Sequence, residues 1–292
     1  MTDLKTILLC TRVNFFKWLV TPRIHTIAAV IIAFGLWSSS GLSEYADAVG
    51  AAVTPWVFPH LLTSPAMLLV FGCLTTLLFC NAPFADDHTP FLVIRSGRLN
   101  WVVGQLLYIV LAGFIYTAFW YVVSVVTLIP NLQLSTDWGK VIKTLAANPM
   151  SARNYGIQLT VFFNPEIIAM FSAVEATLIG FGLFWLVSVF IGVLIFCFNI
   201  VIGKMSGLVA SGVFIFMSYF SIYVGTLNFG PKIYYFSPYS WASMNYLNWK
   251  YTGEIPSPTY AVFCLLGAIL FMSIVSVIVF CKKDMNIQEW GA

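Results

Sequence analysis

The segment of residues 81–101, NAPFADDHTPFLVIRSGRLNW, concentrates ionisable side chains between two long apolar runs. Asp86, Asp87 and His88 are the residues that could act in catalysis or bind a metal, and the cations are Arg95 and Arg98. Carboxylates and imidazoles bind metal ions and act as general acids and bases. The segment could therefore be a catalytic site, a metal site or a contact surface for a soluble partner.

The spacing of the acidic residues argues against chemistry. Asp86, Asp87 and His88 are adjacent, so on a helix they would point in three directions. Intramembrane prenyl-transfer enzymes hold magnesium with acidic residues on facing helices, and the chain has no second acidic cluster on the same side. We expect no metal or cofactor on this chain. An intramembrane enzyme of lipid or isoprenoid metabolism that uses these three residues is the alternative.

Signatures of other enzymes are missing from the sequence. The motifs G-x-S-x-G and H-E-x-x-H do not occur. Gly203 and Lys204 are followed by Met205 where a phosphate-binding loop needs Ser or Thr, and the preceding glycine of that motif is absent. We therefore expect a short turn there and no nucleotide site.

As structure, the segment has the signals of a short helix. Thr89 can cap free amides and Pro90 suits the first helical position. Ser96 and Gly97 are a typical stop, and the acidic residues before the helix and Arg95 near its end have the signs that its dipole favours. Its apolar members are Phe91, Leu92 and Ile94. A stiff helix of this kind could receive force from a soluble partner, or it could be an interfacial turn with no partner.

Composition places this helix on a membrane protein. The chain is 60% hydrophobic and 9% charged, whereas soluble domains carry about 25% charged residues. Long apolar runs predict helices rather than the alternating strands of a barrel. The net charge of +3 does not suggest a nucleic-acid partner. The six cysteines lie in or beside apolar runs, which predicts buried free thiols.

We expect an all-α fold with six membrane spans, each long enough to cross about 30 Å of hydrocarbon. The spans are expected near residues 24–40, 60–81, 101–129, 176–203, 206–227 and 258–281. No linker separates a second domain, so residues 23–292 should form one six-span membrane domain. With the N-terminus inside, nine Lys and Arg residues fall on inner segments and five on outer ones. Both termini and the 81–101 segment are therefore expected in the cytosol.

Residues 1–22 are expected to form an amphipathic helix in the inner membrane interface. The apolar stripe at helical spacing consists of Leu4, Ile7, Leu8, Thr11, Phe15, Trp18 and Leu19. Asn14 lies on the opposite face, and Pro22 separates the helix from the first span. The simpler alternative is a frayed extension of that span.

Two further groups of residues have a structural and a functional interpretation. Aromatic residues around Tyr235, Pro238, Tyr239 and Trp241 could be an aromatic belt at the outer interface or a lid over an exit path. Ionisable or polar groups in a span are functional candidates, and here these are Glu175 and Asn199. We favour a solvated helix end for Glu175 and a hydrogen bond to another helix for Asn199.

This layout resembles the permease subunit of a type-2 ATP-binding-cassette exporter. The resemblance covers essentially the whole chain and rests on two stretches, Thr89 to Arg98 with Trp101 and Gly104, and Phe236 to Trp241. It implies that residues 90–97 are a coupling helix seated on a cytosolic ATPase, through Thr89, Pro90, Phe91, Leu92, Ile94, Arg95 and Arg98. The chain differs from many members in its long connection over residues 130–165.

The resemblance also implies partner subunits and a cellular location. ATP and Mg²⁺ would bind a separate ATPase subunit, and a second permease, identical or related, would complete the exporter in a bacterial cytoplasmic membrane. The substrate would be an amphipathic or hydrophobic peptide, lipid or drug. A membrane-embedded immunity or scaffold protein without transport is a third possibility.

Overall fold

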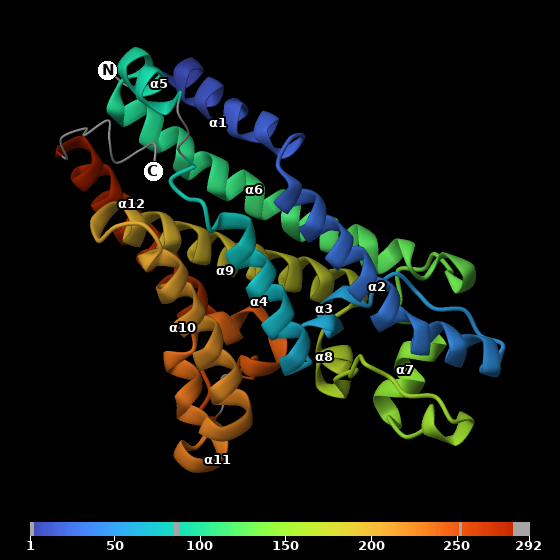
Figure 1. The fold of residues 1–292 in the computed structure, drawn as a ribbon. Coiled ribbons are helices and arrows are strands. Elements are labelled where there is room, and N and C mark those ends of the chain that lie inside the picture. The colour runs from blue at the N-terminus through green and yellow to red at the C-terminus, as the bar shows by residue number, and fades with distance from the viewer. Residues whose placement is uncertain (1–2, 85–87, 251–252, 283–292) are drawn as a thin grey trace.

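The computed structural model describes residues 3–84, 88–250 and 253–282, and the regular elements in these ranges are helices (Figure 1). Strand-like pairing within them is limited to one isolated parallel bridge between Val53 and Leu132. The expectation of an all-α fold is confirmed.

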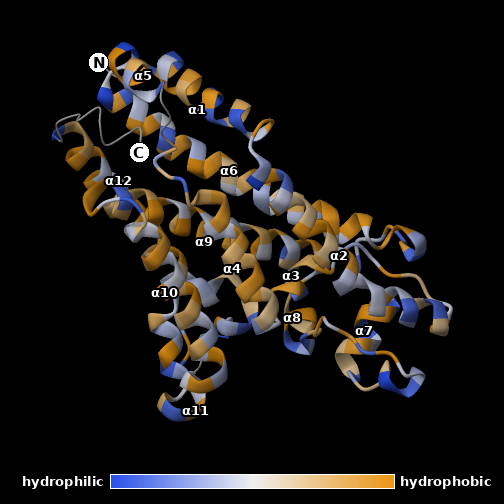
Figure 2. Cartoon of the chain, viewed as in Figure 1, coloured by the Kyte–Doolittle hydropathy of each residue, from blue (hydrophilic) through white to orange (hydrophobic). Residues whose placement is uncertain are grey.

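Five helices of the described chain are long and apolar enough to cross a membrane. They are α2 (Pro22–Val49), α6 (Arg98–Val126), α9 (Ala173–Val201), the continuous α10–α11 stretch (Ser206–Phe229) and α12 (Pro258–Lys282). Hydrophilic residues gather toward the ends of these helices and apolar residues along their middles (Figure 2). The chain is thus an all-α, multi-pass membrane protein.

The expected span over residues 60–81 is divided into two helices. These are α3 (Phe58–Leu61) and the 15-residue α4 (Pro65–Phe79). Pro65 has no backbone N–H to continue a preceding helix, so it begins a new one. The length of α4 is about 22 Å at the helical rise, less than the ~30 Å of a hydrocarbon core. A sixth span therefore stays a prediction.

Helix α9 forms the centre of the molecule. It packs against α12, α6, α10 and α4, and most of its side chains are buried because it is apolar on every face. Small residues permit these close contacts: a side chain at Gly192 would collide with Ile109 of α6 and Phe79 of α4. The helix is fixed to α6 by the Trp185 indole, which donates to the carbonyl of Val110 at 2.9 Å.

The long connection after α6 folds into a small helical lobe. Its elements are the 3-10 helices η1 (Ile129–Asn131) and η2 (Arg153–Tyr155) and the α-helices α7 (Gly139–Ala147) and α8 (Pro165–Met170). The lobe is fixed to the segment before α3, where Thr54 donates to the carbonyl of Trp138 at 2.7 Å and the Trp56 indole to that of Ser135 at 2.6 Å. An apolar face of α7 completes the packing.

The chain after α10 returns toward the core in short turns. A π-helical turn, η3 (Ser221–Gly225), leads into α11 (Thr226–Phe229). Three 3-10 helices follow, η4 (Pro231–Phe236), η5 (Pro238–Ala242) and η6 (Met244–Tyr246). Prolines begin η4 and η5, where their fixed φ suits a tight turn.

Two shorter helices lie at one end of the long bundle (Figure 1). The N-terminal helix α1 (Leu4–Trp18) runs beside α6, and α5 (Thr89–Ser96) stands immediately before α6. The last turn of α12 reaches the same end. We call this region the α5 corner: α5, the first turns of α1 and α6, and the last turn of α12.

Candidate functional site

Helix α5 has nearly the expected bounds and a different first residue. It runs from Thr89 to Ser96, so Thr89 is its first residue rather than its cap, and the cap position falls on His88. Gly97 ends the helix with φ +82°, a value that side chains disfavour, and its N–H donates to the carbonyl of Val93 at 2.9 Å. The predicted stop is confirmed and the predicted threonine cap is wrong.

The two faces of α5 differ sharply. Thr89 and Val93 are buried against the corner, one turn apart. Phe91 and Ile94, by contrast, are 73% and 75% exposed, and Arg95 is exposed on the same side. Spacings of three and four residues place these three side chains together. The helix therefore presents an aromatic, an aliphatic and a cationic side chain outward.

Arg98 lies off this outward face. It is the first residue of α6, and its Nη1 donates to the carbonyl of Cys281 in α12 at 2.9 Å. Next to it, the rings of Trp101 and Phe280 stack with centroids 4.9 Å apart. Of the two arginines expected on the contact surface, the structure brings Arg95 to that surface and binds Arg98 to the end of α12. Leu92 and Pro90 are half-buried beside it.

Helix α1 is fixed to α6 through its polar residues. Thr11 donates to the carbonyl of Gly104 at 2.9 Å, and a side chain at Gly104 would meet the Cβ of Cys10. The buried amide of Asn14 donates to Gln105 at 2.6 Å. Asn14, expected on the outward polar face, is thus on the inner one, because the bare backbone of Gly104 lets this side of α1 approach.

The apolar stripe of α1 is therefore shared between two environments. Ile7 is buried against α6, and the Phe15 ring packs edge-on against Tyr108. Leu4 and Leu8 are 69% and 49% exposed. The exposed leucines suit contact with acyl chains. The interfacial position of α1 stays a prediction, and the apolar face left for the membrane is narrower than the sequence predicted.

Of the three residues of the enzymatic alternative, the structure describes one. Asp86 and Asp87 lie outside the described residues, and His88 is exposed at the cap of α5. Within residues 3–84, 88–250 and 253–282, no group of three His, Cys, Asp or Glu side chains could hold a metal ion. All six cysteines are free thiols, but only Cys197 is buried as expected, because Cys73 is exposed and the other four are half-buried.

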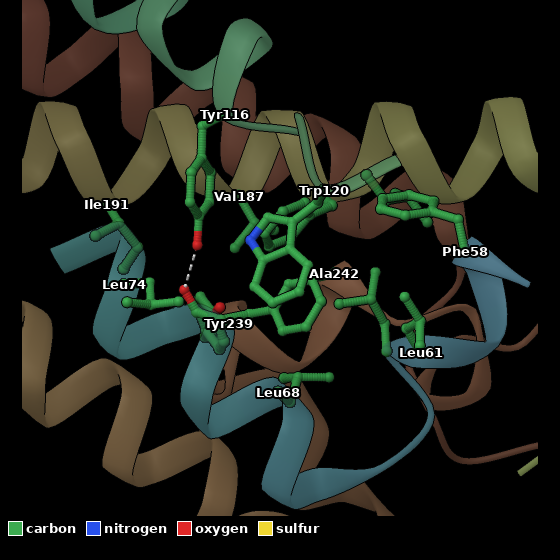
Figure 3. Close-up of a cluster of buried hydrophobic side chains, with 14 of the residues drawn as sticks. Phe58, Leu61, Leu68, Leu74, Tyr116, Trp120, Val187, Ile191, Tyr239 and Ala242 are labelled. Carbon is green, nitrogen blue, oxygen red and sulfur yellow. Dashed lines mark hydrogen bonds between the residues drawn. The ribbon is translucent and has the colours of Figure 1, made fainter. Parts of the chain in front are cut away.

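The aromatic segment that contains Tyr235, Pro238, Tyr239 and Trp241 lies only partly at the surface. Tyr239 is wholly buried and Trp241 nearly so, and Figure 3 shows Tyr239 in one cluster with Tyr116 and Trp120 of α6. The Tyr239 ring lies against Gly72, where an added Cβ would be 3.1 Å from it. An aromatic belt is therefore the wrong interpretation for Tyr239 and Trp241, which are core residues. Tyr235 and Pro238 are half-buried at the edge, and a lid stays a prediction.

Glu175 is an exposed helix cap. Its carboxylate accepts from the Ser172 N–H at 3.0 Å, and its own N–H donates to the Ser172 hydroxyl at 3.3 Å. This reciprocal pair is a capping box, which confirms the interpretation of a solvated helix end. A glutamate three residues after a serine was the sequence signal for it.

Asn199 hydrogen-bonds outside its own helix, as expected. Its side chain donates to the carbonyl of Ala82 at 2.7 Å and accepts from the N–H of Gly207 at 2.8 Å. It thus contacts the segment that leads to α5.

His60 is a buried titratable residue that sequence reasoning missed. It lies in α3, outside the five helices that are long enough to cross a membrane, and its ring centroid is 5.1 and 5.0 Å from those of Trp138 and Phe163. Neither ring nitrogen has a hydrogen-bond partner among the described residues. Burial lowers the pKa of His60 to about 3, so the ring is neutral. Its isolation argues for a packing role.

No family model matches the chain, and no curated protein matches its sequence.

Proposed function

We propose that this chain is the membrane-spanning permease subunit of a type-2 ATP-binding-cassette exporter. The observation that carries the proposal is the outward face of α5, where Phe91 and Ile94 are about three-quarters exposed beside Arg95. A lone eight-residue helix at a membrane protein's end gains nothing from exposing two large apolar side chains to water. It does gain from inserting them into a groove of a soluble partner.

The partner would be a cytosolic ATPase subunit that carries ATP and Mg²⁺, since this sequence holds no nucleotide-binding motif. Two permeases, identical or related, and two ATPases would form one exporter. ATP binding would draw the ATPases together and move both α5 helices, and the membrane halves would alternate access to the two sides. The substrate would be an amphipathic or hydrophobic peptide, lipid or drug, and the membrane a bacterial cytoplasmic membrane.

The corner supports force transmission. Helix α5 is joined to α6 through one residue, Gly97. The first turns of α6 hold α1 through Thr11 and the end of α12 through Arg98. A displacement of α5 would therefore reach three helices at once.

The test is co-purification of the full-length chain with each cytosolic ATP-binding-cassette ATPase of its source cell. Phe91→Ala should weaken the complex by about 2 kcal/mol or more, about thirtyfold in Kd. Phe229→Ala is the matched control, because Phe229 is 69% exposed on α11, far from α5. Retention of the ATPase by Phe91→Ala, or equal loss in Phe229→Ala, would contradict the proposal.

A ranking of variants separates the exporter from the enzyme. Asp86→Asn and Asp87→Asn should reduce transport less than Phe91→Ala, because each removes only a dipole interaction of about 0.3–1 kcal/mol. An enzyme that holds a metal with these carboxylates would show the reverse order. Indispensable aspartates together with a dispensable Phe91 would therefore exclude a coupling helix.

A further inference from the structure

Asn199 uses both ends of its side-chain amide to join separate parts of the chain. It lies two residues before the end of α9. Its Nδ2 donates to the carbonyl of Ala82 at 2.7 Å, and its Oδ1 accepts from the backbone N–H of Gly207 at 2.8 Å. Ala82 precedes α5 and Gly207 is the second residue of α10. One amide thus bridges the approach to α5 and the start of a spanning helix.

The Ala82 end of the bridge belongs to a segment that is held on several sides. We call residues 80–84 the arm, because they connect α4 to the chain that enters α5. Lys17 of α1 donates to the carbonyl of Phe84 at 3.0 Å, and Arg23 of α2 approaches the Cys80 sulfur at 2.9 Å. With Asn199, side chains from three helices bind the arm, so it can carry displacement between them.

The Gly207 end of the bridge is a close helix contact. The N–H groups in the first turn of a helix lack intrahelical partners, and the cap residue of α10, Met205, offers no side-chain hydrogen bond. Asn199 supplies the missing acceptor. A Cβ at Gly207 would lie 2.6 Å from the Cα of Ile195, so α9 and α10 touch through their backbones here.

We propose that Asn199 is a positioning residue that transmits displacement of the arm to the start of α10. A planar amide with two hydrogen bonds in a low-dielectric setting resists stretching at both ends. The source of the displacement rests on the proposed function, whereas the link between arm and α10 is a property of this chain alone.

Two substitutions of Asn199 separate the link from simple capping. Asn199→Asp keeps an oxygen that accepts from Gly207 and loses the donor to Ala82, while Asn199→Leu loses both. Hydrogen exchange of amides 206–210 should rise about tenfold in Asn199→Leu, which loses both bonds, and by a smaller factor in Asn199→Asp, which loses only the bond to the arm. Asn228→Leu is the control, because Asn228 is exposed and donates to Val224 in its own turn. Exchange at the wild-type level in Asn199→Asp would mean that Asn199 only caps α10, and this result would overturn the proposal, as would unchanged exchange in Asn199→Leu.

Weakening the contacts of the arm tests whether displacement passes from the arm to α10, and this test needs no ATPase. Lys17→Met should raise exchange of amides 206–210 in the wild type, because Asn199 is then less firmly held. It should have no such effect on the Asn199→Asp background, where the arm is already disconnected. A rise on both backgrounds, or on neither, would overturn the proposal. Arg23→Met repeats the test if Lys17→Met does not fold.

The complex with an ATPase gives the functional readout. Asn199→Asp should bind the ATPase as the wild type does, because α5 is unaltered, and should export about tenfold less substrate per ATP hydrolysed. Normal export would show that Asn199 only caps α10. If no ATPase binds the wild type, the proposed function fails, and the exchange experiments still decide on the link.

Discussion

The guanidinium of Arg98 donates a 2.9 Å hydrogen bond to the carbonyl of Cys281, a residue 183 positions further along the chain. The last carbonyls of a helix have no intrahelical donors, and a cation beside them is favoured by the helix dipole. This contact therefore closes the end of α12 onto the first residue of α6. It makes the α5 corner one packed unit.

Removal of this contact should loosen α12. Arg98→Leu should lower the free energy of unfolding by about 1–3 kcal/mol and speed hydrogen exchange in the last turn of α12. Denaturant unfolding in detergent and exchange measured by mass spectrometry would show both effects. Arg95→Leu, on the exposed face, should leave both unchanged. Equal effects of the two substitutions would contradict a specific role for Arg98.

The buried Asn14–Gln105 pair should behave as a coupled pair. Asn14→Leu leaves the Gln105 amide buried without its donor, which should cost about 1–3 kcal/mol. The double variant Asn14→Leu, Gln105→Leu should recover part of that loss, because both polar groups are then gone. A double-mutant cycle of unfolding free energies measures the coupling. Full additivity would mean that α1 is not fixed at this point.

The orientation of the chain can be read by labelling. Single cysteines replacing the exposed residues Glu44 and Gly253 should react with an impermeant thiol reagent in intact cells. A cysteine at Arg95 should react only after permeabilisation, because the excess of cations predicts that the α5 corner lies inside. A background with the six native cysteines replaced is the control. Labelling at position 95 in intact cells would reverse the topology and remove the basis for an ATPase contact.

His60 should make stability depend on pH. Its pKa is lowered to about 3 in the folded protein by burial, whereas it is about 6.5 in an unfolded chain. The unfolded state therefore binds the proton first, and stability is full above pH ~6.5 and falls as pH drops from ~6.5 toward 3. Between pH 7 and 5 the loss should be about 2 kcal/mol.

Unfolding of His60→Phe across the same range checks this prediction. Phenylalanine fits between Trp138 and Phe163 and does not titrate, so the variant should lack this loss. His25→Phe, at a site outside the core, should keep it. An unchanged pH profile in His60→Phe would show that other groups cause the dependence.

Local signals in the sequence determined the class of the fold and the ends of its elements. Long apolar runs require helices in a membrane, because an unpaired backbone is costly in hydrocarbon. Gly97 marked the end of α5, and Pro65, which the expected span over residues 60–81 overlooked, begins α4, since each acts through its own backbone. Glu175 was recognisable as a helix end because a serine three residues before a glutamate can form a capping box. These features depend on neighbours within a few residues.

Only the tertiary structure decided which face of an apolar helix meets protein and which meets lipid. Both environments are apolar, so hydrophobic periodicity cannot distinguish them. Contact with Gly104 turned Asn14 inward, and the space over Gly72 admitted Tyr239 to the core. The bonds of Arg98 to α12 and of Asn199 to the arm join distant segments. Such pairings follow from how the helices pack, which no single stretch of sequence specifies.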